Sequence, residues 1–578
     1  MTPRPIHLAS WMFKTWTGLA LAMILSGASW AQGSSLRVHD LRALRSQSQS
    51  IAAPRLVLPL QNALRDGGSW VESALGRTEE ERPDLEQLVD DLMEEVGGEQ
   101  AMEEEKLRIE LSSGILYVHA TDEIHEQIGR RLAHLRDHLS ATVNTEVYLL
   151  GASDLSTLTT SVLGAGEVQA FRSGGRQPIL AGQLLNGRQC RLSATKSESW
   201  VGSFDIEVAQ EAIIGDPSVG VLRTGSDLNL RVFPAPEGRI FVQVQVSASE
   251  SLGTKTHELG GSPGGRIELP RVHSVVAAGE ATLENGGGMV IGSTDGPGLY
   301  LISLTRVGPA ANLPRALHCA PLITSPVPAS PPVVTSPLPT GVTWDGLTSE
   351  FSCDTDLEGP IDLGALQDLI VREFPETFDE SGSSIRFMGT TLIVRADGEV
   401  ERKAGELIVG LTEATAETRQ IEVAYGRLVD RPSRDGETLA GALPHRGVLS
   451  ARSGFRTTLA AGVETAIVGE MSVEIASKAI GSTPRIESLF SGLVFTAQAS
   501  PANQGRFALA GELTWQDAKG PPRSFDPNSD AVGFVELNAL DQTESAIRVN
   551  VEAGVWTRIH TVKIAGSEDS FVLMVRVR

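Results

Sequence analysis

The chain is poor in aromatic residues, in cysteine and in positive charge. Of its 578 residues 5% are aromatic and three are cysteine, and 49 basic residues stand against 72 acidic ones. Three cysteines are too few for a disulfide framework. A formal net charge of -23 repels phosphate backbones and anionic lipid, so no nucleic acid partner is expected. Glycine and proline are plentiful, at 59 and 30, which favours short strands joined by turns.

Long apolar runs are missing except at the start of the chain. A basic beginning is followed by the apolar run Thr17–Gly27, which is too short to span a bilayer, and by the small residues Ser29 and Ala31. This pattern predicts a secretory signal peptide, residues 1–31, cleaved near Ala31; a short membrane anchor is the alternative. No other stretch is long enough to cross a bilayer, so no transmembrane helix is expected in the mature chain.

A proline-rich segment, Cys319–Trp344, divides the mature chain into two halves of similar size. It is rich in serine and threonine and nearly uncharged, so we expect it to be extended and semi-rigid. Cys319 and Cys353 flank this segment. Two alternatives remain for this pair: a disulfide between Cys319 and Cys353, or buried free thiols. A buried free thiol is also expected at Cys190.

The two halves resemble each other in two blocks. The twenty residues from Leu116 match those from Leu392 at six positions, where about one match is expected from average composition. Phe204–Gly225 matches Met471–Gly492 at seven positions, and the two offsets, 276 and 267, are nearly equal. The sequence therefore predicts an internal duplication.

Each half is expected to begin with a small βαββα module. An apolar stripe from Leu85 to Val96 predicts a helix, and alternation around "SSG" in Lys106–Ala120 predicts a hairpin. Thr121 and Asp397 stand at matched positions and are good N-caps for the helices that follow. Strands "NTEVYLL" and "RQIEVAYGRL" are expected to close the two modules.

These patterns predict an α+β fold of two tandem repeats. Each repeat would be a small βαββα module followed by an antiparallel all-β, sandwich-like domain, because segments such as "IFVQVQVSASE" alternate strongly. The expected boundaries are 1–31 for the signal peptide, 32–150 and 151–310 for the first module and β-domain, 311–346 for the linker, and 347–428 and 429–578 for the second module and β-domain.

Potential metal ligands are present but do not form a convincing motif. His134 and His138 have the i,i+4 spacing of a zinc pair, yet the matched positions of the second half are glycine and alanine, so a solvated helix face is favoured. The "HE" pairs at His125 and His257 lack the second histidine of a zinc protease motif.

Two glycine-rich stretches also fail as catalytic motifs. "GGSPG" around Ser262 formally matches G-x-S-x-G, but a strand rather than a helix is expected after it, so a hairpin loop is favoured. "GGGMVIG", Gly286–Gly292, lacks the dinucleotide-binding pattern. We assign no catalytic, metal-binding or cofactor-binding residue and no cofactor, and expect a protein that is not an enzyme.

The order of motifs resembles the secretin family, the ring-forming outer-membrane proteins of type II and type III secretion. Asp216–Glu250 is similar to the strand pair of the secretin β-domain, and Arg266–Thr294 to its glycine-rich ending. Residues that follow the order of a secretin periplasmic module are Gly114, Leu116, Val118, Thr121, Glu123, His125, Ile128, Leu132, Leu135 and Arg136.

The resemblance implies an exported protein, in the periplasm or at the outer membrane, that self-associates or joins a secretin ring as part of a secretion or related envelope assembly. The segment that forms the membrane-embedded lip of secretins is missing from both halves, so we expect no transmembrane pore from this protein alone. The alternative function is a monomeric exported module that binds an envelope polymer or a partner protein.

Overall fold

The computed structural model describes most of the chain after residue 141. The described residues are 34–40, 89, 92–93, 107–112, 115–139, 142–324 and 360–578, apart from gaps in the last two ranges. The gaps in 142–324 are 159, 188, 209–212, 260–264 and 308–315. The gaps in 360–578 are 379–382, 389, 430–434, 477–478, 503–504, 521–522, 526–534, 538–539 and 565–566. The predicted signal peptide and Cys353 lie outside them. Contacts divide the chain into two units, residues 1–47 with 81–137 and residues 48–80 with 138–578.

The first unit contains a three-stranded antiparallel sheet and the helix that follows it. The strands β1 (Ser34–Asp40), β3 (Ile115–Thr121) and β2 (Leu107–Ser112) lie in that order, and α5 (Asp122–Leu139) begins directly after β3. Ile128 and Leu132 of α5 are buried with Leu116 and Val118 of β3, as the apolar spacing predicts.

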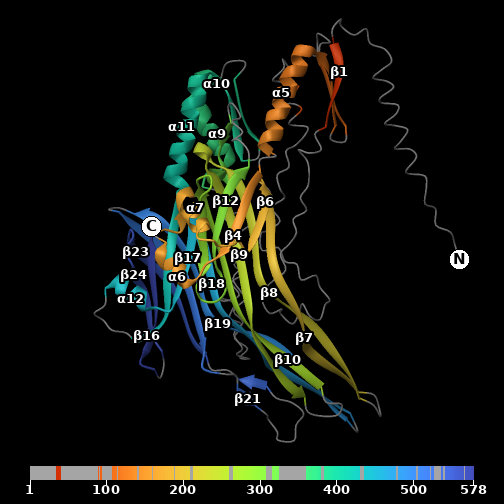
Figure 1. Cartoon of the computed structure of the whole chain (residues 1–578), viewed down its shortest axis with the longest axis vertical. Helices are drawn as coiled ribbons and strands as arrows, with labels where there is room; N and C mark the ends of the chain where they lie inside the picture. Colours follow the sequence, from red (N-terminus) through yellow and green to blue (C-terminus); the bar gives the residue numbers. More distant parts are fainter. Residues whose placement is uncertain are drawn as a thin grey trace, which may run out of the picture. The chain divides into compact units, whose positions relative to one another are not determined.

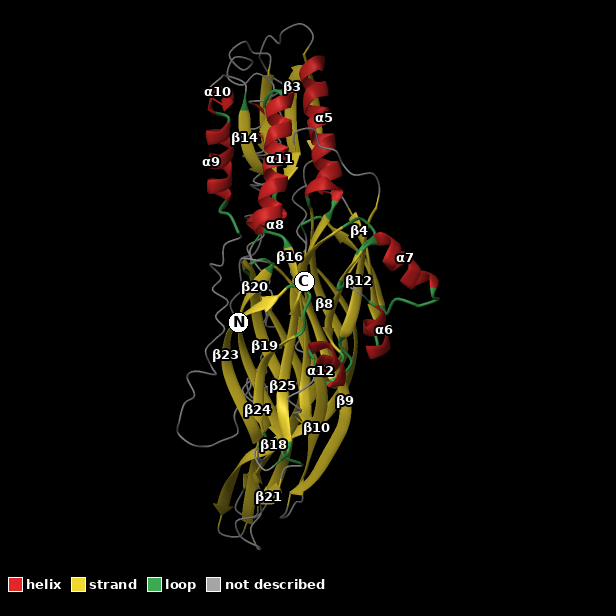
Figure 2. Cartoon of the chain, turned by 90° about the vertical axis from the view of Figure 1, so that its left-hand side faces the viewer, coloured by secondary structure: helices red, strands yellow, loops and turns green. Residues whose placement is uncertain are grey.

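Two large antiparallel sheets make up most of the second unit (Figures 1 and 2). The eight-stranded sheet has the order β7 (Gln189–Val208), β8 (Ile213–Pro234), β9 (Ile240–Leu259), β10 (Gly265–Leu283), β18 (Arg456–Ala476), β19 (Ala479–Ala502), β20 (Arg506–Ala518) and β23 (Leu540–Glu552). The nine-stranded sheet has the order β6 (Leu180–Leu185), β4 (Thr142–Leu149), β12 (Leu299–Val307), β11 (Gly288–Ser293), β17 (His445–Arg452), β16 (Thr418–Val429), β25 (Asp569–Val577) and β24 (Thr557–Lys563), with β5 (Val162–Leu163) beside β11.

The main core lies between these two sheets. Alternate residues of β9, such as Val242, Val244 and Val246, point into it and pack in one cluster with Ile291 of β11 and Phe571 of β25. This alternation follows from the two-residue period of a strand. The facing sheets thus form a sandwich to which both halves of the chain contribute.

Short helices cover the outer face of the nine-stranded sheet. Val168 of α7 (Ala165–Ser173) packs on Val290 and Leu301, beside α6 (Ala152–Thr157). Leu439 of α12 (Gly436–Ala442) packs on Val572 at the other end of the sheet. The strands of this sheet are therefore covered on both faces over much of their length.

A small three-stranded sheet with its own helices completes the second unit. Its order is β13 (Ala316–His318), β15 (Thr391–Arg395) and β14 (Ser384–Met388). Asp397 caps α11 (Gly398–Thr415) by accepting hydrogen bonds from the amides of Glu399 and Val400, so the predicted N-cap is confirmed.

The remaining elements are α8 (Ala320–Ile323), α9 (Leu363–Glu373), α10 (Pro375–Phe378), the 3-10 helix Pro236–Gly238, β21 (Arg523–Phe525) and β22 (Val535–Leu537). β13 and α8 thus fall in the segment 311–346, which was predicted to be a linker. None of the described helices is long and apolar enough to cross a bilayer.

The predicted α+β fold of two tandem βαββα repeats is wrong. The protein is mostly β, with large antiparallel sheets that strands of both halves share. The strands expected to close the two modules, β4 and β16, instead enter the nine-stranded sheet. Neighbouring residues on them, Val147 with Tyr148 and Val423 with Ala424, are all buried. Strands with two apolar faces need cover on both sides, and a small two-layer module has only one covered face.

A buried ion pair links the two halves inside the sandwich. Nε of Arg452, on β17, donates to Oε1 of Glu280, on β10, at 2.5 Å, and the Arg452 side chain is 0% exposed. Its Nη1 donates to the carbonyl of Pro321 at 2.9 Å, and Gln243 donates to the second Glu280 oxygen at 3.2 Å. Buried charges are tolerated when they are paired and hydrogen-bonded in this way.

We predict that Arg452→Ala lowers the free energy of unfolding by about 3 to 5 kcal/mol, because it leaves the Glu280 carboxylate buried without its charge partner. Urea unfolding followed by circular dichroism measures this. Arg485→Ala is the matched control, since the Arg485–Glu470 pair is about half exposed and should cost at most about 1 kcal/mol. Equal losses in the two variants would contradict the prediction.

Candidate functional site

The histidines of the two "HE" pairs each contact an oxygen atom of a residue in their own unit. His125 is buried and its Nε2 lies 2.8 Å from the carbonyl oxygen of Ser35. His257 lies on β9, 3.3 Å from a carboxylate oxygen of Glu536. His134 and His138 lie on α5, but their side chains and Ser262 fall outside the described part of the structure. Among the described residues no three His, Cys, Asp or Glu side chains form a group that could hold a metal.

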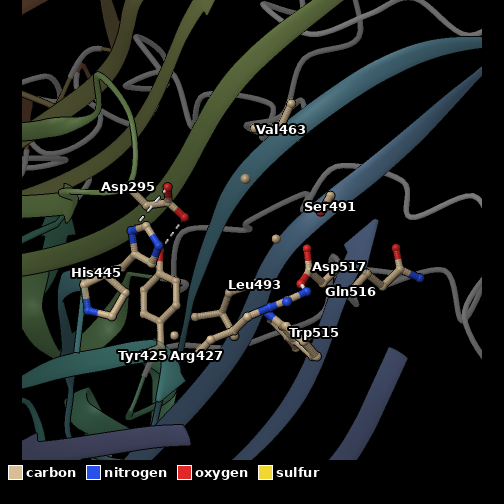
Figure 3. Close-up of a pocket in the computed structure, with 14 residues that line it drawn as sticks. Asp295, Tyr425, Arg427, His445, Val463, Ser491, Leu493, Trp515, Gln516 and Asp517 are labelled. Carbon is tan, nitrogen blue, oxygen red and sulfur yellow. Dashed lines mark hydrogen bonds and ion pairs between the residues drawn. The ribbon is translucent and has the colours of Figure 1, made fainter. Parts of the chain in front are cut away.

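A polar cluster at the junction of the two halves is the most developed site. Asp295 follows β11, and Figure 3 shows it beside Tyr425 and His445. Its Oδ1 is 3.0 Å from Nε2 of His273 on β10 and 3.4 Å from Nδ1 of His445 on β17. Its Oδ2 accepts a hydrogen bond from the Tyr425 hydroxyl, on β16, at 3.3 Å. The rings of Tyr425 and His445 stack with centroids 5.2 Å apart.

The surroundings hold Asp295 in its charged form. Burial raises the pKa of this carboxyl, but the hydrogen bond with His273 and the neighbouring charge of His445 outweigh burial, so its pKa lies below the usual value. Burial, followed by the nearby charge of Asp295, raises the pKa of the Tyr425 hydroxyl well above 10. Tyr425 is therefore a neutral hydrogen-bond donor to an anionic carboxylate.

A cavity of about 320 Å³ adjoins this cluster. Gly462 and Gly492 line it where their backbones approach, since a Cβ on either would come within 2.5 Å of a facing carbonyl oxygen. Arg427 pairs with Asp517 over the ring of Trp515, and these side chains form a second wall of the cavity (Figure 3). Gln516 is buried, and neither polar atom of its amide has a partner.

The cluster does not have the geometry of a hydrolase. Ser293 donates to the carbonyl of Arg446 at 3.0 Å, and its Oγ is 3.0 Å from the Tyr425 hydroxyl. A serine nucleophile of the Ser-His type needs a histidine base in contact with its hydroxyl, whereas the Ser293 hydroxyl contacts a carbonyl, a phenol and the backbone amide of Asp295. The arrangement is suited to fastening two strands and to binding a small polar group.

No local sequence pattern marks this site. Asp295 and Tyr425 are separated by 130 residues, and each histidine comes from a different strand. Only the sharing of one sheet by both halves brings these residues together.

We predict that Asp295→Asn lowers the thermal midpoint at pH 7, with a loss of about 1 to 3 kcal/mol for a buried hydrogen-bonding charge. A carboxyl with a lowered folded-state pKa adds stability above its unfolded pKa and loses it as pH falls through the folded value. The difference in thermal midpoint between the variant and the unaltered protein should therefore shrink below pH 4. Thermal scans from pH 3 to 8 measure this difference. Glu512→Gln, at an exposed carboxylate of β20, is the control; a gap that stays constant over this range would contradict the assignment.

No family model and no curated protein sequence matches the chain. Secretins are among the solved structures that match. The Salmonella SPI-1 injectisome secretin InvG is 12% identical over 39% of this chain and 81% of that chain, with a TM-score of 0.21. The V. cholerae type IV competence pilus secretin PilQ is 12% identical over 34% of this chain and 67% of its own, with a TM-score of 0.17. The Klebsiella pneumoniae type II secretion outer-membrane complex with PulD is 8% identical over 100% and 84%, with a TM-score of 0.18. TM-scores this low establish neither a shared fold nor a shared function.

Proposed function

We propose that this is an exported, non-enzymatic protein of the cell envelope that self-associates into a secretin-like assembly. The observation that carries the proposal is how the edge strands of the two large sheets are paired. Within the described residues, β7 and β23 at the edges of one sheet, and β6 and β24 at the edges of the other, each pair with a strand on one side only.

The edge strands of the eight-stranded sheet are long enough to pair with a strand of another chain. β7 has 20 residues and β23 has 13, and neither contains proline. Edge strands present unpaired backbone groups, and proteins usually protect them by shortening them, bending them or placing proline in them. The register of β7 shifts only after Val201, and that of β23 does not shift, so β23 and the first part of β7 are extended edges suited to pairing with another chain. The motif order that resembles secretins, and the predicted signal peptide, support the same function.

A second candidate function is a monomeric binding module, and the cavity beside Asp295 favours it. The unpartnered amide of Gln516 and the charged walls of this cavity could hold a small polar group of a polymer or partner. Such a module would need no contact between copies, so the molar mass in solution separates the two candidates.

We predict that the mature chain forms discrete particles of several copies. Light scattering coupled to size exclusion should give a mass several times that of one chain, which is 61.5 kDa before any cleavage, and electron micrographs should show uniform particles. A mass of one chain at every concentration up to about 100 µM would overturn the proposed self-association and leave the binding module.

A further inference from the structure

We propose that Arg446, on the outer face of the nine-stranded sheet, binds one oxyanion group, a phosphate or a carboxylate, of a small molecule. The guanidinium of Arg446 would donate to two oxygens of that group beside the ring of Trp556. This inference goes beyond the proposed self-association and does not depend on it.

The strand position of Arg446 sets the direction of its side chain. It stands two residues before Val448 on β17, and Val448 packs with Val290 on the outer face of the sheet, so Arg446 shares that face. Its backbone is held on both sides. The N–H donates to Oγ1 of Thr294 at 2.9 Å, and the carbonyl accepts from the hydroxyl of Ser293 at 3.0 Å. The side chain therefore begins from a well-anchored part of the junction between the halves.

An aromatic ring holds the guanidinium. Cζ of Arg446 lies 4.8 Å from the centroid of the Trp556 ring, and Cζ of Arg576 lies 4.7 Å from the same centroid. Trp556 is buried and packs with Leu439 of α12 and Met574 of β25. A guanidinium over an aromatic face is attracted by the ring. Its N–H groups lie in its own plane, so they stay available to donate.

The acidic side chains nearby are already used by other arginines. Arg576 lies 2.5 Å from an oxygen of Glu422 and 3.1 Å from one of Glu437, and Nε of Arg578 lies 3.3 Å from Glu422. Within the part of the chain that the structure describes, no acceptor lies within hydrogen-bonding distance of the Arg446 guanidinium. Two glutamates thus neutralise two arginines, and the charge of Arg446 is left over.

Partial burial makes this unpaired charge unfavourable. Burial lowers the pKa of the Arg446 guanidinium, and the attraction of Glu422 only partly offsets it. Charges that are withdrawn from water are normally paired. Arg172, another partly buried arginine on this face, follows the rule, since it lies 2.8 Å from a carboxylate oxygen of Glu146. Arg446 therefore lacks the counter-ion that its surroundings favour.

The first half shows that the fold itself does not require a charge at this place. β4 lies 276 residues before β16, and β4 pairs with β6 as β16 pairs with β17. These ladders put Ile179 at the place of Arg446. Ile179 is 41% exposed, so an apolar side chain is tolerated there.

The geometry and charge of the surroundings limit the class of ligand. The planar N–H fork of an arginine matches two oxygens of a carboxylate or a phosphate. The net charge of -23 repels extended polyanions and anionic membranes, whereas charges farther away than about 10 Å are screened at 0.1 M salt. A small anion at Arg446 feels mainly the nearby charges, so a small molecule is favoured.

Phosphorus NMR of inorganic phosphate tests the site on the full mature chain, with ionic strength held constant by sodium chloride. Exchange with a large protein should broaden the phosphate signal. In Arg446→Gln the affinity should fall about tenfold or more, which corresponds to the loss of one charge-assisted hydrogen bond. Acetate should reduce the broadening by the unaltered protein, because its carboxylate competes for the same donors.

Arg306→Gln is the matched control. Arg306 is a partly buried arginine of β12 whose pKa burial also lowers, and among the described residues no aromatic ring lies over it. This variant should keep the broadening, whereas Trp556→Leu should lose part of it. Equal losses in Arg446→Gln and Arg306→Gln, or no broadening by the unaltered protein, would overturn the proposal.

Sedimentation with vesicles separates a small ligand from a lipid headgroup. Phosphatidylglycerol vesicles should bind the unaltered protein no better than phosphatidylcholine vesicles do. Binding to phosphatidylglycerol that is lost in Arg446→Gln would assign the site to a lipid phosphate and overturn the small-molecule ligand.

Two measurements keep the test decisive. Competition by acetate needs no variant, so it holds even if Arg446→Gln fails to fold as judged by circular dichroism, and broadening that acetate does not reduce would contradict the site. The light-scattering mass of Arg446→Gln should equal that of the unaltered protein. Failure of the anion site and failure of the proposed self-association are therefore distinguishable.

Discussion

The backbone ladder between β10 and β18 is the contact on which the arrangement of the second unit depends. It runs from Arg271 opposite Thr465 to Ala278 opposite Thr458 and makes one sheet from two distant parts of the chain. An edge strand presents a row of unpaired amides and carbonyls, which is costly where it is buried away from water and is otherwise a template for pairing. Each half provides this pairing for the other at one edge, and the opposite edges, at β7 and β23, are left open in the described structure.

Polar side chains make this junction specific. Ser274 of β10 donates to Glu464 of β18 at 3.1 Å, and Thr457 donates to the carbonyl of Ala278 at 2.5 Å. Glu280 of the buried ion pair and His273 of the Asp295 cluster both lie on β10, the strand that forms this ladder. Because a buried charge or donor without a partner is costly, a displaced register would break several of these contacts at once.

The sequence predicts the local structure well and the shared sheets poorly. The β2–β3 hairpin, α5 and the cap at Asp397 follow from periodicity and turn chemistry within about twenty residues. The pairing of β10 with β18 depends on contacts about 190 residues apart, and no local pattern encodes it. The same distance hides the Asp295 cluster, and the two apolar faces of β4 and β16 were the available signal that these strands belong to a larger, doubly covered sheet.

The ion pair at the junction of the two halves has no counterpart at the outer edges of the two sheets. At the offsets that relate the halves, Arg548 stands in the place of Glu280 and Leu185 in the place of Arg452. The buried ion pair is therefore specific to the junction between the halves and is not repeated by Arg548 on β23 or by Leu185 on β6. The internal junction is also favoured because covalent linkage removes the entropy cost of association. The two halves should thus stay joined under conditions that would separate two chains held together by the same side-chain contacts.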